Sequence, residues 1–228
     1  MEKWLQLLAK SKENMRVAEE RATKKLLIEC AAQHPLKDDG TPADEFESRL
    51  ERSVELYNKY KSNGWQVNIF VPGSLHRVMS TTGEYVVDKM PLYQAGERYL
   101  IERGVSVTDI LAEQANKQYK GEKGVYCSAD ECFVSANIFL NGDYQRFIAV
   151  CSPAQSLRKV LYYLLFETLP IVYTASPEDH TVECFHHYVY EAYGLKEILD
   201  TMDTMQGDDC ELAKIVRKDR NPFYKEED

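Results

Sequence analysis

The sequence predicts an α/β fold: a Rossmann-like three-layer α/β/α sandwich with a mostly parallel sheet. The first observation is that short apolar runs alternate with amphipathic segments of helical length, the pattern of β–α–β units. The second is the stretch 146–165, where an apolar run stops at Ser152-Pro153 and a helical pattern carrying Arg158 begins. Open α/β sheets bind ligands at such strand ends, so this stretch also indicates where the site lies.

The first half of the chain is expected to supply two strands and their helices. Apolar side chains at 46, 50, 54 and 57 recur at spacings of three and four, which predicts an amphipathic helix ending at Asn63-Gly64. Pro35, Gly40 and Pro42 mark a polar loop before it. The expected elements are a helix to about residue 24, strand 25–30, loop 31–42, helix 43–61, strand 66–71, a Gly/Thr-rich loop and helix 92–103.

The second half continues the alternation. We expect a turn and a third strand over 105–113, a protruding polar loop over 116–124, and a helix over 128–140 with Ser128 as its N-cap. Strand 147–151, helix 154–166, strand 170–175 and a Tyr-rich helix over 184–199 follow. The domain organisation is an N-terminal helical extension (1–24), the α/β domain (25–200) and an acidic tail (201–228).

Composition excludes several classes of function. The net charge is −9 with no Lys/Arg cluster, which disfavours nucleic-acid binding. No segment approaches the length of a membrane span, and the N-terminus lacks an apolar signal core. Six cysteines without a CxxC pair are typical of reduced thiols. We therefore expect a cytoplasmic protein whose partner is a small molecule, with neither membrane nor nucleic acid.

Polar residues follow four of the expected strands. Parallel strands end on one edge of a sheet, so these residues are expected to line one crevice. Gly73 would let a ligand approach the backbone, although a turn glycine explains it as well. Arg158 would hold a phosphate or carboxylate, unless it is a solvated helix residue. The strand-end residues are Gln33 and His34, then Gly73, Ser74 and His76, then Glu113, and finally Ser152.

Other chemistry has weaker support. Glu131 lies in the first turn of its helix, where an acid also stabilises the helix dipole. His186 and His187 are adjacent, so they point to different faces of a helix, and no metal site is expected. The chain contains no G-x-S-x-G, G-x-G-x-x-G or G-x-x-x-x-G-K-[ST] motif, which disfavours a nucleophile-elbow hydrolase, a conventional dinucleotide site and a P-loop.

Five sequence blocks occur in a recognisable order. The first block is a strand (26–30) followed by Asp-Gly-Thr-Pro (39–42), Arg-Leu (49–50) and Leu-Tyr (56–57), and the second is a strand ending in a glycine turn (69–74). The third contains Gln-Ala (94–95), Tyr-Leu-Ile-Glu-Arg-Gly-Val (99–105) and Asp-Ile-Leu-Ala-Glu (109–113). The fourth is Ser-Ala-Asp-Glu-Cys (128–132), and the fifth is Val-Cys-Ser-Pro-Ala-Gln-Ser-Leu-Arg-Lys (150–159). Together they resemble the YdcF/SanA-like family of bacterial α/β proteins.

The chain departs from the family pattern at three positions. Cys30 stands where the family has glycine, Gln94 where it has an acid, and Gln155 where it has histidine, while Gly73, Glu113, Glu131 and Arg158 match. Glutamine cannot act as a general acid or base, so the resemblance favours binding over proton transfer. It implies a crevice at the strand ends and an adenosyl-type ligand. The expected ligand-binding residues are Gln33, Gly73, Ser74, Gln94, Glu131, Ser152, Gln155 and Arg158.

Three functions follow as hypotheses. The first is binding of a small polar, anionic or nucleotide-like ligand by these residues. The second is a hydrolase or transferase with Glu113 or Glu131 as general base, assisted by His34 or His76; it requires a carboxylate whose pKa is raised by burial. The third is a protein-interaction module using the N-terminal helix or the aromatic helix 184–199.

Overall fold

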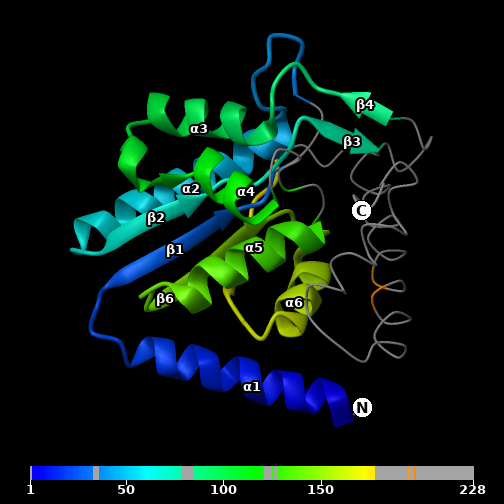
Figure 1. Ribbon diagram of the computed structural model, residues 1–228. Helices are drawn as coiled ribbons and strands as arrows, with labels where there is room; N and C mark the ends of the chain where they lie inside the picture. Colours follow the sequence, from blue (N-terminus) through cyan, green and yellow to red (C-terminus); the bar gives the residue numbers. More distant parts are fainter. Residues whose placement is uncertain are drawn as a thin grey trace.

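The computed structural model describes residues 2–32, 36–78, 85–120, 125, 128–177, 195 and 198. Five parallel strands form one sheet in the order β5-β2-β1-β6-β7, and β3 and β4 form a separate antiparallel pair. The α/β sandwich expected from the sequence is thereby confirmed (Figure 1). The strands are β1 (Lys25–Cys30), β2 (Gln66–Phe70), β3 (His76–Val78), β4 (Tyr85–Val87), β5 (Ile110–Leu111), β6 (Arg146–Cys151) and β7 (Ile171–Thr174).

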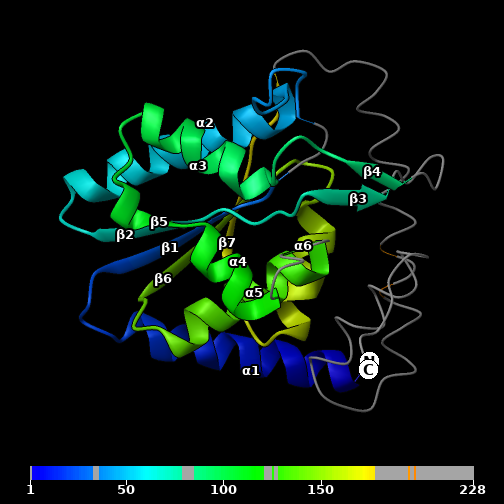
Figure 2. The same cartoon turned by 45° about the horizontal axis from the view of Figure 1, so that its top comes forward.

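Helices cover both faces of the sheet, which Figure 2 shows between its two helical layers. One layer contains α2 (Asp44–Ser62) and α3 (Leu92–Glu102). The other contains α1 (Glu2–Glu19), α4 (Glu113–Lys120), α5 (Ser128–Asn141) and α6 (Ser156–Leu165). Alternate strand side chains must therefore enter two different cores.

The central strand β1 shows this alternation. Leu26, Ile28 and Cys30 pack with the α2/α3 layer, and Leu27 packs with the α5/α6 layer. Glu29 points the same way as Leu27 and is completely buried. Both faces of β1 are thus covered, and one of them holds a carboxylate.

The N-terminal helix α1 packs on the α5/α6 layer. Ala18 is fully buried in that core, with Trp4, Leu7 and Met15 packed against it. Asn14 Nδ2 donates to the carbonyl of Glu167 at 2.9 Å. In the part of the chain that the structure describes, no helix is both long enough and apolar enough to cross a bilayer.

Several boundaries differ from the sequence expectations. α1 ends at Glu19, and Ser128 lies inside α5 instead of capping it. The third strand, β5, is only two residues long and follows a 3-10 turn over Val107–Asp109. A hairpin, β3–β4, forms where a loop was expected. The expected helix over 184–199, apart from residues 195 and 198, and the tail 201–228 lie outside the described residues.

The expected loop over 116–124 was wrong for residues 116–120, which belong to α4. The reason is Asn116, which is completely buried. Its Nδ2 donates to the carbonyls of Val71 and Ala112, and its Oδ1 accepts from the Gly73 amide. The bonds to Val71 and Gly73 tie the start of the helix to the segment directly after β2.

Candidate functional site

The strand order places a topological switch point between β1 and β6. The chain leaves β1 toward β2 and β5 on one side of the sheet, whereas β6 and β7 extend the other side. In an open α/β sheet, the crevice at such a point lies outside the carboxyl ends of the two strands. Here those ends are Cys30 and Cys151.

Three of the expected site residues follow β6: Ser152 and Gln155 in the turn, and Arg158 in the first turn of α6. Ser152 and Arg158 are each 3% exposed. The Gln155 amide donates to the carbonyl of Ser152 at 3.1 Å, which closes the turn before α6. Gln155 Oε1 is buried and accepts no hydrogen bond from any residue within the described ranges. The turn and the start of α6 therefore place a cation, a hydroxyl and an amide oxygen after the carboxyl end of β6, and all three are buried.

A buried ionic triad lies next to this turn. Lys159, one residue after Arg158, is completely buried and contacts Glu29 on β1 and Glu131 on α5. Its Nζ is 2.9 Å from Glu131 Oε2. Tyr163, one turn along α6, donates its hydroxyl to Glu29 Oε2 at 2.9 Å. The triad thus links the central strand to both helices of this face.

The three charged groups of the triad shift one another's pKa values. Burial raises the pKa of Glu29, opposed by Lys159, while the charge of Glu131 raises it further. The pKa of Lys159 is also raised: desolvation lowers it, but Glu131 and Glu29 together outweigh that effect. The two directions agree physically, because one ammonium stands between two carboxylates. The ammonium therefore stays charged, and burial makes the charged form of Glu29 costly.

The cysteines near the triad are unreactive. Cys30, Cys132 and Cys151 are free and buried. Burial raises the pKa of Cys30 to about 12 and that of Cys151 to about 11. These thiols are therefore neutral at physiological pH and are not nucleophiles. Among the described residues, no group of His, Cys, Asp and Glu is arranged to hold a metal ion.

A buried arginine holds the chain directly after β1. Arg49 on α2 is completely buried, and its Nη1 donates to the carbonyls of Ala31 and Ala32, directly after β1. Its Nη2 is 3.4 Å from Glu45 Oε2. The side chain therefore fixes the direction in which the chain leaves β1.

The end of β2 is packed more tightly than a ligand-approach role for Gly73 suggests. A Cβ on Gly73 would lie 2.5 Å from Leu92 Cβ and 3.2 Å from Ala32 Cβ, and the residue has φ +126°. Its amide already donates to Asn116. Ser74 is 3% exposed, and its carbonyl accepts from the Leu92 amide at the start of α3. Packing and turn geometry thus account for the glycine without a ligand.

The remaining candidates are dispersed. Gln94 is exposed in the first turn of α3. Glu113 is exposed at the start of α4 and pairs with Lys117 at 2.7 Å. His76 begins β3, and its side chain lies outside the description; Gln33 and His34 lie outside the described residues. Of the expected site residues, Glu131 is the one that contacts α6: it pairs with Lys159, next to Arg158 in sequence.

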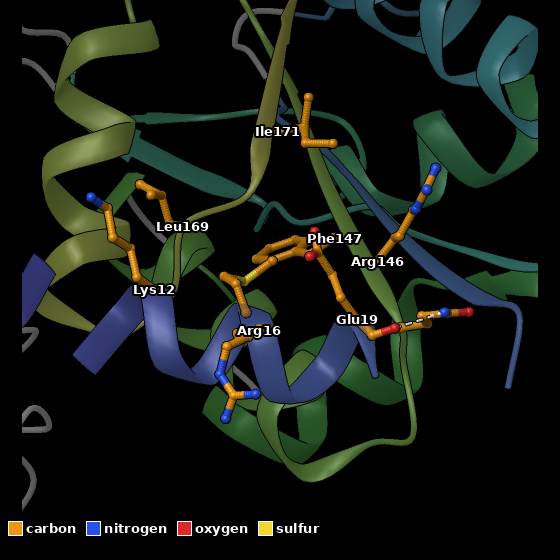
Figure 3. Close-up of a pocket in the computed structure, with 9 residues that line it drawn as sticks. Lys12, Arg16, Glu19, Arg146, Phe147, Leu169 and Ile171 are labelled. Atoms are coloured by element: carbon orange, nitrogen blue, oxygen red, sulfur yellow. Dashed lines mark hydrogen bonds between the residues drawn. The ribbon is translucent and has the colours of Figure 1, made fainter. Parts of the chain in front are cut away.

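A separate cavity of about 180 Å³ lies at the opposite edge of the sheet (Figure 3). It is lined by the start of β6 and β7 and by α1, with Met15, Phe147, Leu169 and Ile171 as its apolar wall. Arg16, at its rim, is engaged by Glu13 and Glu20 on its own helix. Because it lies at the amino ends of the strands, this cavity is distinct from the crevice at the switch point.

Comparison of the chain with family models, curated proteins and solved structures finds no match. The candidate site therefore stands on the geometry of this chain alone.

Sequence reasoning missed Glu29 and Lys159. Glu29 carried a readable signal, because it is the one acid in the run Leu26-Leu27-Ile28-Glu29-Cys30 of a central strand. A carboxylate buried on such a strand needs a cation partner. Lys159 gave no such signal, since it follows Arg158 in a helix where either residue suits a solvated face.

Proposed function

We propose that this protein binds a small polar, anionic ligand of nucleotide or adenosyl type in the crevice between the carboxyl ends of β1 and β6. The observation that carries the proposal is the strand order, which puts a switch point where Arg158, Ser152 and Gln155 follow β6. Arg158 supplies the cation for the anionic group, and its guanidinium suits a phosphate or carboxylate.

The polar groups around Arg158 support binding of a ligand with several hydrogen-bonding atoms. The buried Gln155 Oε1 accepts nothing from the described residues, and a buried oxygen without a donor is costly. Gln155 and Gln94 cannot transfer protons, which is consistent with binding as the primary role.

We also propose that the chain is a distant relative of the YdcF/SanA-like proteins and acts in the cytoplasm. The order of the five sequence blocks and the parallel sheet support the kinship. The adenosyl-type ligand rests on that resemblance, whereas the anionic character of the ligand rests on Arg158.

The test is a thermal-shift and calorimetric screen of nucleotides, adenosyl compounds and sugar phosphates against wild type and Arg158→Ala. We expect Arg158→Ala to weaken binding of a stabilising anionic compound by about tenfold or more, since a charge-assisted contact is lost. The matched control is Arg146→Ala. Arg146 is an exposed arginine at the amino end of β6, whereas Arg158 follows the carboxyl end of that strand. Equal affinity in wild type and Arg158→Ala contradicts the proposal.

A hydrolase or transferase is the second candidate, and the position of Glu131 favours it over Glu113. Glu131 is 8% exposed beside the crevice, whereas Glu113 is exposed and paired with Lys117. Burial raises the pKa of Glu29, but this carboxylate is completely buried and out of reach of a ligand. Turnover of a phosphoester or glycosyl substrate that is lost in Glu131→Gln would establish this reaction.

A further inference from the structure

The cavity between α1 and the amino ends of β6 and β7 belongs to the way in which α1 docks on the sheet. Asn14 Nδ2 donates to the carbonyl of Glu167, and Lys10 pairs with the carboxylate of the same residue, which precedes β7. Gln145, which precedes β6, donates from Nε2 to the carbonyl of Glu19 at 2.9 Å. The helix is thus fastened to both segments that lead into the strands lining the cavity.

One wall of this cavity is apolar. Phe147 on β6 is completely buried, Leu169 and Ile171 come from the segment entering β7, and Met15 faces them from α1. Ile171 is 50% exposed, so the apolar wall is open to solvent. A comparable apolar cavity of about 150 Å³ takes up benzene, so a volume of about 180 Å³ has room for an apolar group of about six carbons.

Most polar groups on the opposite wall are already engaged. Arg16 is paired with two acids of its own helix. Gln145 uses both ends of its side-chain amide, since Nε2 donates to the Glu19 carbonyl and Oε1 accepts from a backbone amide at 3.1 Å. The Arg146 guanidinium lies 4.9 Å from the centre of the Trp65 ring, which packs against the α2/α3 layer. These three side chains border the cavity without offering it a free group.

Lys12 is the cation that remains. Its side chain is exposed, and within the described part of the chain its ammonium forms no ion pair. Glu19, the acid among the lining residues, comes seven positions later on the same helix, which corresponds to about 10 Å along the helix axis. Figure 3 shows the two side chains at opposite ends of the cavity. An anionic group therefore fits at the Lys12 end, away from Glu19.

We propose that this cavity is a second binding site, which takes a monocarboxylate with a short apolar body. The carboxylate pairs with the Lys12 ammonium, and the body lies against Met15, Phe147, Leu169 and Ile171. Three lining residues are cations and one is an acid, so the charge of the cavity also favours an anion. The site is independent of the crevice at the switch point, because it shares no residue with it.

The experiment is a titration of the full chain with small probes, followed by NMR. Hexanoate carries both features, acetate lacks the apolar body, and hexylammonium has the same chain with the opposite charge. We expect hexanoate to bind and each of the other two to bind about tenfold or more weakly, because each loses one class of contact.

Two variants locate the binding. Lys12→Met keeps an apolar stem and removes the charge, and we expect it to weaken hexanoate about tenfold, to the level of 1-hexanol. The matched control is Lys59→Met, which removes the same charge from an exposed position on α2, in the other helical layer, and is expected to change nothing. Ile171→Glu puts an acid on the apolar wall at a half-exposed position and is expected to abolish hexanoate binding.

Each contrary result overturns a stated part. Hexanoate that does not bind, or binds no better than acetate or hexylammonium, overturns the ligand class. Binding that survives Lys12→Met, or that falls equally in Lys59→Met, overturns the role of Lys12. Binding that survives Ile171→Glu overturns the location. None of these results bears on the crevice, whose test uses Arg158→Ala.

Discussion

The two faces of the sheet are built from the same strands but hold different interiors. The face under α2 and α3 is lined by apolar side chains such as Leu26, Ile28 and Val150. The face under α5 and α6 is apolar toward the amino edge, with Phe147 stacked on Phe139 at 5.2 Å between ring centroids. Toward the carboxyl edge it contains the Glu29–Lys159–Glu131 triad.

This contrast teaches where apolar packing ends and polar chemistry begins. On β1, Ile28 and Glu29 are neighbours in sequence and both are completely buried, yet they face opposite layers. The apolar face needs only shape and volume. The ionic part needs a charged partner as well. A buried ion pair often contributes no more to the free energy of unfolding than apolar residues of the same volume, so stability alone does not explain the triad. Its location beside the switch point is the reason to look for function there.

The largest expected effect comes from breaking the ionic face with Lys159→Met. The substitution leaves Glu29 in the interior without its cation, and we expect a loss of about 3–5 kcal/mol in the free energy of unfolding. Chemical denaturation measures it. Adding Glu29→Gln is expected to restore most of the loss; a double variant no more stable than Lys159→Met contradicts the account.

A smaller effect is expected on the apolar face from Ile28→Val, one residue away from Glu29. Removing one buried methylene is expected to cost about 1 kcal/mol, with the ligand preference of the crevice unchanged. The same denaturation and calorimetric measurements apply. A cost as large as that of Lys159→Met would mean that the two faces do not differ as described.

The smallest expected effect is on pH dependence and requires Glu29→Gln as the reference. The folded-state pKa of Glu29 lies above its ordinary value of 4.5, so the folded protein holds this proton more tightly than the unfolded chain. The contribution is favourable below pH 4.5 and is lost as pH rises through the raised pKa. Relative to Glu29→Gln, wild-type stability is expected to decline over that window. Parallel profiles of the two proteins would contradict the raised pKa.

The sequence was sufficient for the architecture because the alternation of apolar strands and amphipathic helices is a local signal. Strand 66–71 and helix 43–61 were expected to within about one residue of β2 and α2. Local signals failed where a distant contact decides the outcome. Residues 116–120 read as a polar loop, but the bonds from Asn116 to Val71 and Gly73 make them a helix.

The candidate site shows the same limit. Ser152 and Arg158 were predicted from the strand-to-helix transition that contains them. The partner of Glu131 was not predictable, because Lys159 is recognised as buried only once α6 is placed against β1. Glu29 and Lys159 are separated by 130 positions along the chain. A single sequence gives no measure of that proximity.

This separation also has a consequence for how the chain matures on the ribosome. β1 and β2 can pair early, since Lys25 meets Gln66, but β1 must wait for β6, whose Arg146 meets Leu26. Until then the edge of β1 that pairs with β6 has no partner strand. Such late, non-local pairing is slow and exposes nascent chains to aggregation. The face of β1 that holds Glu29 is completed later still, since the partners of this carboxylate, Lys159 and Tyr163, lie on α6 after β6 in the chain.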